Sequence, residues 1–276
     1  NPGINNPGLV EPAGPTDPEV CFISVQSVDG KPIALLANYS LHYVGGVGPG
    51  HISADYFGAF AVKIGQLLGA GPEFVGIMSN GTSGDINNID FRGGQEKQPP
   101  YGRIQIVAND VAQAVAAAVK NVTHVDSLPL SVAQKEIELG LRIPSKDEVE
   151  KAREITKQSK LFPRMETMEQ VYARETVLLA DFPPKVSAPL QIMKIGDLHV
   201  SAIPAEVFVE IGLELKKRHS PTFTVSLANA YHGYLPTPEH HKLGGYETWR
   251  ARSSCLEVDA STKIIAGLEE LFAKLK

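Results

Sequence analysis

Cysteine, long apolar runs and an excess of positive charge are all missing from this sequence, and each absence excludes a class of protein. Its two cysteines, Cys21 and Cys255, cannot form a disulfide framework or a cysteine zinc site by themselves. No run reaches the roughly 18 apolar residues of a membrane-spanning helix. Lysine and arginine number 26 against 31 acidic residues, which gives a net charge of −5. The chain has no general basic field, so we expect no nucleic acid as a partner.

The composition that remains is that of a folded domain rich in turns. Of the 276 residues, 43% are hydrophobic and 21% are charged, and there are 25 glycines and 20 prolines. Residues 1–18 form a Pro/Gly-rich segment that starts at Asn1 without Met or a signal peptide, and this segment resembles an interior linker. We therefore expect residues upstream of Asn1 to be missing and residues 19–276 to form the folded part.

Strand and helix patterns alternate over most of the chain. Asp29-Gly30 and Gly196-Asp197 are hairpin signals, and Ser145 with Glu148 makes a capping box. Strands are expected at 19–27, 32–41, 73–79, 129–140, 186–195, 198–203 and 222–228. Helices are expected at 54–68, 102–120, 145–158, 166–180, 206–217 and 260–275. This alternation predicts one α/β domain with a mixed sheet covered by helices and a site at the carboxyl ends of the strands.

Polar residues follow four of the expected strands, where loops converge in an open α/β sheet. These places are His42, the loop SNGTSGDINNIDF (79–91), Glu206 in Pro204-Ala205-Glu206, and NAYHGY (229–234). Histidine, carboxylate and tyrosine oxygen donors around one ion suit zinc.

A structural reading of the same residues stays open at this point. A single histidine at a strand end is more often hydrogen-bonded than a ligand, and Glu206 at a helix start would be favoured by the dipole. The tyrosines of 229–234 would pack at a sheet edge, and EHH (239–241) would be a solvated turn because no HExxH pattern surrounds it. Periodicity does not choose between these readings.

Several common catalytic motifs are absent from the sequence. It contains no GxSxG elbow, no Walker A sequence and no CxxC, and GGVGPG lacks the dinucleotide-binding spacing. These classes of enzyme are excluded.

Five segments together resemble the neutral/alkaline non-lysosomal ceramidase family in order and spacing. They are NYSLHYVGG (38–46) with ISADYFGAF (52–60), FVGIMSNGTSGDINN (74–88), IPAEVFVEIG (203–212) and NAYHGYLPTPEHHKLGGYE (229–247). The resemblance runs from about residue 19 to 260. It implies a secreted or periplasmic hydrolase that cleaves the amide bond of ceramide with a zinc ion held by two His, one Glu and one Tyr.

The resemblance also assigns roles to residues of this chain. His42 matches the second His ligand, Glu206 the Glu ligand and Tyr234 the Tyr ligand. Tyr246 matches a tyrosine beside the scissile carbonyl, where it would donate a hydrogen bond to the developing oxyanion. Asp55, in the SxD element, and Asp85, in the SGD loop, are expected to support a ligand or a loop.

The chain departs from the family pattern at two places. The family's first His ligand lies in an upstream HTH segment with no counterpart here, and an upstream arginine is absent too. We therefore expect this chain to lack part of its own metal site: either a segment of the same protein outside this chain completes the site, or this chain holds the metal weakly. The second departure is Asn87, which stands where the family carries a serine important for activity. An amide cannot be a nucleophile, but Asn87 could still bind the substrate.

These observations support two hypotheses about function. The first is a zinc-dependent hydrolase that cleaves a C–N amide bond in ceramide, a related N-acyl lipid or another small amide. The alternative is a catalytically inactive ceramidase-like protein that binds lipid or carbohydrate or acts as a scaffold. The missing serine and first histidine favour the alternative.

Overall fold

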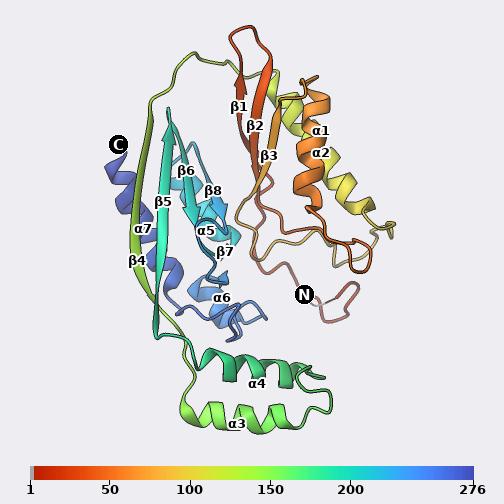
Figure 1. The fold of residues 1–276 in the computed structure, drawn as a ribbon, viewed down its shortest axis with the longest axis vertical. Coiled ribbons are helices and arrows are strands. Elements are labelled where there is room, and N and C mark those ends of the chain that lie inside the picture. The colour runs from red at the N-terminus through yellow and green to blue at the C-terminus, as the bar shows by residue number, and fades with distance from the viewer. Residues whose placement is uncertain (1–2) are drawn as a thin grey trace.

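The first sheet of the computed structural model, which describes residues 3–276, has three strands in the order β1-β2-β3. These are β1 (Cys21–Gln26), β2 (Pro32–Tyr39) and β3 (Val75–Asn80). β1 and β2 form the antiparallel hairpin expected at Asp29-Gly30, and β3 is parallel to β2. Helices α1 (Asp55–Leu67) and α2 (Gly102–Val119) cover one face of this sheet and bury Tyr56, Phe60 and Ile104 (Figure 1).

The second sheet has four strands in the order β4-β5-β6-β8. They are β4 (Leu130–Gly140), β5 (Lys185–Ile195), β6 (Leu198–Ile203) and β8 (Thr222–Ser226). β5 and β6 form the hairpin expected at Gly196-Asp197, whereas β8 is parallel to β6. The C-terminal helix α7 (Ala260–Lys274) lies on the outer face (Figure 1), where Leu190, Ile264 and Leu268 are fully or almost fully buried.

Two helices between β4 and β5 form a hairpin that projects from the end of the second sheet (Figure 1). They are α3 (Lys146–Lys157) and α4 (Met168–Leu179). The capping box expected at Ser145 and Glu148 is present at the start of α3. Arg250 pairs with Glu148 and Arg252 with Glu175, so both helices are tied to the loop that follows Tyr246.

A third sheet has two short strands, β7 (Glu206–Val207) and β9 (Tyr234–Leu235), and helix α6 (Pro238–Leu243) follows it. This arrangement corrects the expected helix at 206–217: helix α5 (Val209–Arg218) begins three residues later, and Glu206 lies in a strand. The backbone N–H of Glu206 donates to the Gly233 carbonyl at 2.8 Å. This pairing with a distant segment outweighs the local preference for a helix.

The α/β class expected from the sequence is confirmed, with the strands divided among three sheets. The two larger sheets meet at the carboxyl ends of β2, β3 and β8. There, the Asn38 side chain donates to the Ser79 hydroxyl at 3.0 Å and to the Thr224 carbonyl at 3.1 Å. The loops that follow β2, β3 and β8 therefore begin close together at this junction.

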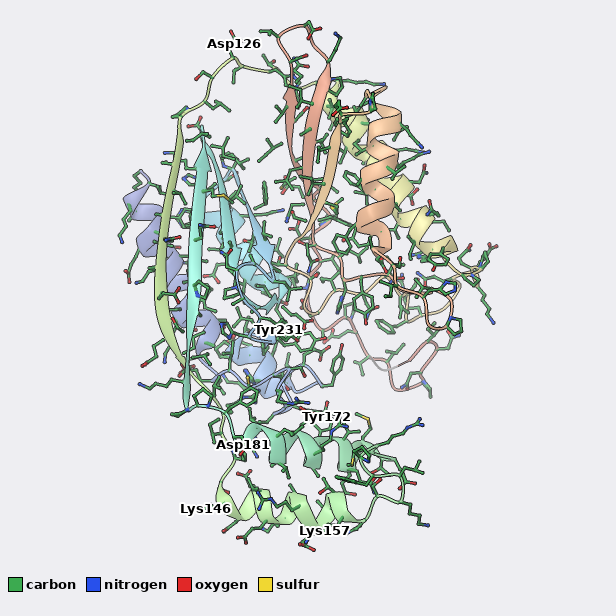
Figure 2. The ribbon with its side chains drawn as sticks, in the orientation of Figure 1. Asp126, Lys146, Lys157, Tyr172, Asp181 and Tyr231 are labelled. Atoms are coloured by element: carbon green, nitrogen blue, oxygen red, sulfur yellow. The ribbon has the colours of Figure 1, made fainter. Side chains whose placement is uncertain are left out.

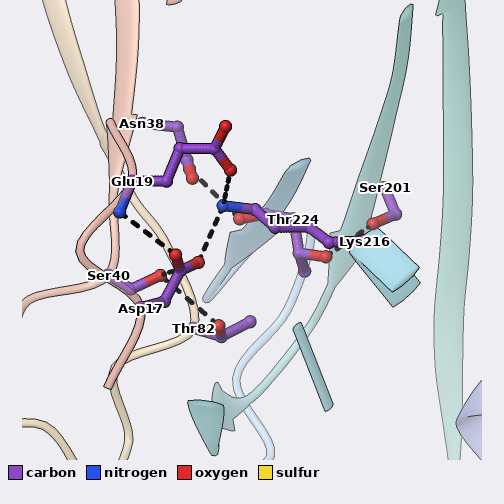
Figure 3. Close-up of polar contacts among 8 residues, drawn as sticks. All are labelled: Asp17, Glu19, Asn38, Ser40, Thr82, Ser201, Lys216 and Thr224. Atoms are coloured by element: carbon purple, nitrogen blue, oxygen red, sulfur yellow. Dashed lines mark hydrogen bonds and ion pairs between the residues drawn. The ribbon is translucent and has the colours of Figure 1, made fainter. Parts of the chain in front are cut away.

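A charge network around the buried Asp17 lies beside this junction (Figure 3). Lys216 on α5 donates to Asp17 at 2.7 Å and to Glu19 at 2.8 Å, and the Asp17 side chain is only 5% exposed. The Ser40 hydroxyl, just after β2, donates to Asp17 as well. The network therefore fastens the segment before β1 to α5 and to the end of β2.

Among residues 3–276, no helix combines the length and the apolar character needed to cross a membrane.

Candidate metal and hydrolase site

Glu206 and Tyr234 are direct neighbours in the parallel pair of β7 and β9. Their segments follow β6 and β8, two parallel strands whose carboxyl ends lie together. The glutamate side chain is 15% exposed and the tyrosine is half-buried. Two residues given a ligand role by the resemblance are thus held side by side, 28 positions apart in the sequence.

His42 reaches the same place from the end of β2. Its Nε2 lies 3.8 Å from Oε2 of Glu206, and its side chain is 27% exposed. The backbone N–H of Tyr43 donates to Nδ1 at 3.0 Å, so Nε2 is the nitrogen that faces the glutamate. Two ligands of a tetrahedral zinc ion, with bonds of about 2.0–2.2 Å, lie roughly 3.4 Å apart. The observed spacing and the N/O donor set therefore fit such an ion.

Tyr234 and Tyr246 are in edge-to-face contact, with ring centroids 5.9 Å apart. Burial is the largest cause that raises the pKa of each hydroxyl, and the negative charge of Glu206 acts in the same direction on both. Both phenols are therefore protonated donors at neutral pH in the absence of a cation. A cation beside Glu206 would reverse this preference for Tyr234, because positive charge favours the phenolate.

Asp55 supports the loop that follows His42. Its two carboxylate oxygens accept from the backbone N–H groups of Val44 and Gly45 at 2.9 and 2.8 Å. Its backbone φ of 53° is in the left-handed region, which is strained for a residue other than glycine. The aspartate thus holds this loop through its backbone and not through the His42 side chain.

Asp85 lies on the loop after β3 and is tied to the start of α5. Its Oδ1 accepts from the Val209 N–H at 2.9 Å. The preceding Gly84 N–H donates to the Val207 carbonyl, and a Cβ on Gly84 would lie 2.6 Å from the Glu206 carbonyl oxygen. Burial raises the pKa of Asp85 to about 7, and the nearby Glu210 adds to this effect. Gly84 and Asp85 therefore fix the segment that carries Glu206.

Asn87 is exposed in the same loop. Its neighbour Asn88 donates to the Val44 carbonyl at 3.5 Å, which connects this loop to the segment after His42. The exposed Asn87 amide is thus accessible to a ligand from solvent.

Asp85, Glu210 and His240 form a second group of potential metal ligands, with ligand atoms within 4.8 Å of one another. His240 Nε2 lies 3.4 Å from Glu210, and its Nδ1 is 2.7 Å from the Thr237 hydroxyl. The solvated turn expected at 239–241 is wrong for His240, which lies on α6 with its side chain 12% exposed, against the ring of Phe208. Thr237 as N-cap and Pro238 at the first helical position are the signals that predict this helix.

Tyr231 is a further site residue, although the tyrosines of 229–234 were expected to pack at a sheet edge. Its hydroxyl donates to Oε1 of Glu206 at 2.9 Å. Partial desolvation of the hydroxyl and this hydrogen bond raise the pKa of Tyr231 to about 12, although most of the ring is exposed. Figure 2 shows Tyr231 between the lower ends of the two large sheets. It is the first tyrosine of NAYHGY, and only the fold shows that it faces Glu206.

The same fold is found in solved ceramidase structures. Neutral ceramidase from Pseudomonas aeruginosa has a TM-score of 0.62 and 17% identity, with 93% of this chain and 46% of that chain covered. A ceramidase complexed with C2 has a TM-score of 0.64 and 15% identity, with 91% and 47% covered. The chain thus spans about half the length of these ceramidases. No protein-family model and no curated protein matches the sequence. The resemblance drawn from the motifs is confirmed for the fold, which is that of about half of a neutral ceramidase chain.

Proposed function

We propose that this chain is the ceramidase-like part of a zinc-dependent hydrolase that uses water to cleave a C–N amide bond. Ceramide, a related N-acyl lipid or a small amide is the proposed substrate. The observation that carries the proposal is the approach of His42 Nε2 to Glu206 Oε2 at 3.8 Å, beside Tyr234, within a ceramidase fold. This donor set is the one that the sequence motifs select.

In this proposal His42, Glu206 and Tyr234 hold the metal. When bound, zinc supplies a Lewis acid that acidifies water and polarises a carbonyl group. His42 offers Nε2, and Glu206 offers Oε2 from a strand whose backbone is hydrogen-bonded to the segment before Tyr234. The resemblance adds a further histidine, so the proposal includes a ligand from a segment of the same protein outside these 276 residues.

Tyr246 is proposed to donate a hydrogen bond to the substrate oxygen. Its ring touches Tyr234 and its side chain is partly exposed, so it can reach both the metal ligands and a bound molecule. Because burial raises its pKa, Tyr246 keeps its proton at neutral pH. A fixed donor of this kind stabilises charge that develops on a carbonyl oxygen.

A binding protein without turnover is the second candidate, and Asn87 is the observation that favours it. The exposed amide stands where the family carries serine. Its two polar atoms suit hydrogen bonds to a lipid or carbohydrate ligand but supply no nucleophile. A zinc-dependent cleavage of the ligand would rule this candidate out.

Zinc content tests the proposal directly. Elemental analysis of the wild type should give about one zinc per chain, either in the 276-residue form or in a form extended upstream. Glu206→Gln should lose the ion, because an amide is a poor ligand. Glu210→Gln is the matched control: it removes a carboxylate from the second group, four residues away, and should keep the ion.

The opposite pattern would move the metal to the second group. If Glu210→Gln loses zinc and Glu206→Gln keeps it, Asp85, Glu210 and His240 hold the ion and the proposed ligand set is wrong. If no form binds zinc, the hydrolase proposal fails and the binding protein takes its place. Release of fatty acid from a short-chain ceramide, dependent on added zinc, would support the hydrolase proposal.

Export to the periplasm or the outside of the cell is part of the same proposal. Its support is the family resemblance alone. Cell fractionation of the complete gene product checks it, and recovery only in the cytoplasm would contradict it.

A further inference from the structure

Glu206 uses its two carboxylate oxygens for different contacts. Oε2 faces His42 Nε2 at 3.8 Å, whereas Oε1 accepts the hydroxyl of Tyr231 at 2.9 Å. The side chain is 15% exposed, so water has little access to it. Because Oε1 already accepts a hydrogen bond from a phenol, it binds a metal ion less readily than Oε2 does. The contact with Tyr231 therefore leaves Oε2 as the available ligand atom.

Backbone hydrogen bonds connect the segment that carries Tyr231 to the segment that carries Glu206. Leu227, Ala228 and His232 donate their backbone N–H groups to the carbonyls of residues 205, 203 and 204, at 3.0, 3.1 and 2.9 Å. Glu206 in turn donates to the Gly233 carbonyl at 2.8 Å. Four backbone hydrogen bonds thus fix the two segments relative to each other and hold the phenol within reach of the carboxylate.

The ring of Tyr231 is not part of the hydrophobic core. The residue is 57% exposed, unlike Tyr56, which is fully buried under the first sheet. Core packing therefore does not explain its position, whereas its hydroxyl is hydrogen-bonded to Glu206. Removing the hydroxyl should leave folding almost unchanged, because exposed substitutions have small effects on stability.

We infer that Tyr231 is a positioning residue: its hydroxyl holds Oε1 of Glu206 so that Oε2 alone is presented to a divalent metal beside His42. This inference rests on the proposed zinc site and names a residue to which neither the motifs nor the comparisons give a role. Carboxylates that ligate metals are themselves held by hydrogen bonds, and losing such a partner typically costs 10–100-fold in metal affinity.

Zinc affinity is the measurement that tests this role. Tyr231→Phe keeps the ring and removes the hydroxyl, so the zinc dissociation constant, measured by competition with a chelator, should rise about 10–100-fold. Tyr43→Phe is the matched control. Tyr43 is also exposed and its ring contacts His42, so this control removes a hydroxyl beside the other ligand and should bind zinc like the wild type. The metal-free melting temperature should be the same for all three proteins.

Cobalt(II) in place of zinc gives a second readout that a merely structural role would not change. Its visible absorption reports coordination number, and freeing Oε1 should let Glu206 bind through both oxygens. The spectrum of Tyr231→Phe should therefore shift, whereas that of Tyr43→Phe should not.

The outcomes separate this inference from the proposed function. If the wild type binds zinc and Tyr231→Phe binds it equally well with an unchanged cobalt spectrum, the positioning role is wrong and the zinc site stands. If Tyr231→Phe loses affinity only because its metal-free form melts at a lower temperature, the role is structural and the inference is also overturned. If the wild type takes up no zinc in any form, the proposed function fails and this inference fails with it.

Discussion

Glu206 and Tyr234 lie opposite each other in a sheet of only two short strands. The pair is connected by the hydrogen bond from the Glu206 N–H to the Gly233 carbonyl, and Tyr234 itself donates to the Ser253 carbonyl at 2.8 Å. Two side chains that would be flexible on separate loops are therefore held in a fixed register. Changes to the backbone around this pair should alter metal binding even when no ligand is replaced.

Gly84→Ala should disturb the Glu206 segment without removing any polar group. The added Cβ would lie 2.6 Å from the Glu206 carbonyl oxygen and 2.9 Å from the Phe208 ring, so the strand must move. We expect a loss of about 1–3 kcal/mol in the free energy of unfolding, as for other overpacked sites, and weaker zinc binding. Gly71→Ala is the control, since a Cβ there meets no atom within 4 Å. Urea unfolding and zinc titration of both variants measure these effects, and equal behaviour would contradict the close packing.

Lys216→Met should destabilise the fold by breaking the pair with the buried Asp17 (Figure 3). An uncompensated charge would remain in a side chain that is 5% exposed, while the apolar stem of Lys216 is replaced. We expect a cost of roughly 2–4 kcal/mol, slightly below the range for fully buried pairs. Lys217→Met removes a charge from the exposed neighbouring position and should change stability by less than about 0.5 kcal/mol. Chemical denaturation compares the two, and a similar small effect in both would show that the Asp17 pair contributes little.

Asp85→Asn should remove a pH dependence of stability. Burial raises the pKa of Asp85 to about 7 in the folded state, above its ordinary value of 3.8. Between these values the folded state binds more protons than the unfolded state, so the contribution of Asp85 to stability falls as the pH rises from about 4 to 7. Asn87→Gln serves as an exposed amide control in the same loop.

Urea unfolding at pH 5 and pH 7.5 measures this contribution. The wild type should lose roughly 1–4 kcal/mol more than Asp85→Asn between the two pH values. The variant keeps an acceptor for the Val209 N–H, so its fold should persist. Parallel pH profiles for wild type and variant would show that Asp85 is ionised in the folded protein.

Tyr246→Phe should reduce turnover and leave zinc binding unchanged. The variant retains the ring that packs against Tyr234 and loses only the donor. Loss of one oxyanion donor typically costs 10²–10³ in kcat, or about 2.7–4 kcal/mol of transition-state stabilisation. Steady-state kinetics on a short-chain ceramide, together with zinc content, separates the two effects. Full turnover in the variant would remove Tyr246 from the mechanism.

Asn87→Ser should raise activity towards ceramide if the proposed substrate is correct. The substitution places at an exposed loop position the serine that the family resemblance associates with activity. A polar contact matched to the substrate commonly changes kcat/KM by tenfold or more, so we expect a gain of about that size. Asn88→Ser is the neighbouring control, because that residue is half-buried and donates to the Val44 carbonyl. No gain at position 87 would point to a substrate other than ceramide.

Local signals in the sequence predicted most elements of the fold correctly. The hairpins at Asp29-Gly30 and Gly196-Asp197 and the capping box at Ser145 depend on hydrogen bonds between residues only a few positions apart. Such signals fail where a distant segment competes with them. Glu206 begins a helical pattern, but it pairs with residue 234 and becomes a strand instead.

In the candidate site, too, some features follow from local sequence signals and others depend on distant segments. The position of His42, Glu206 and Tyr234 after strand ends was visible in the chain, because loops at the carboxyl ends of parallel strands converge. Two contacts were not visible: Tyr231 with Glu206 across 25 positions, and His240 with Glu210 across 30. The first depends on how the loop before β9 lies against β7, and the second on how helices α5 and α6 are placed relative to each other.

The sequence by itself determined the α/β class, the turns and caps, and the set of residues that resembles a zinc hydrolase. Only the tertiary structure decided that the strands divide into three sheets, that Glu206 lies in a strand and that Tyr231 occupies one of its oxygens. The physical reason is the distance along the sequence between the residues that interact. Caps and turns are satisfied within four residues, whereas the site is built from backbone pairings and side-chain contacts that close loops of 25 to 164 residues.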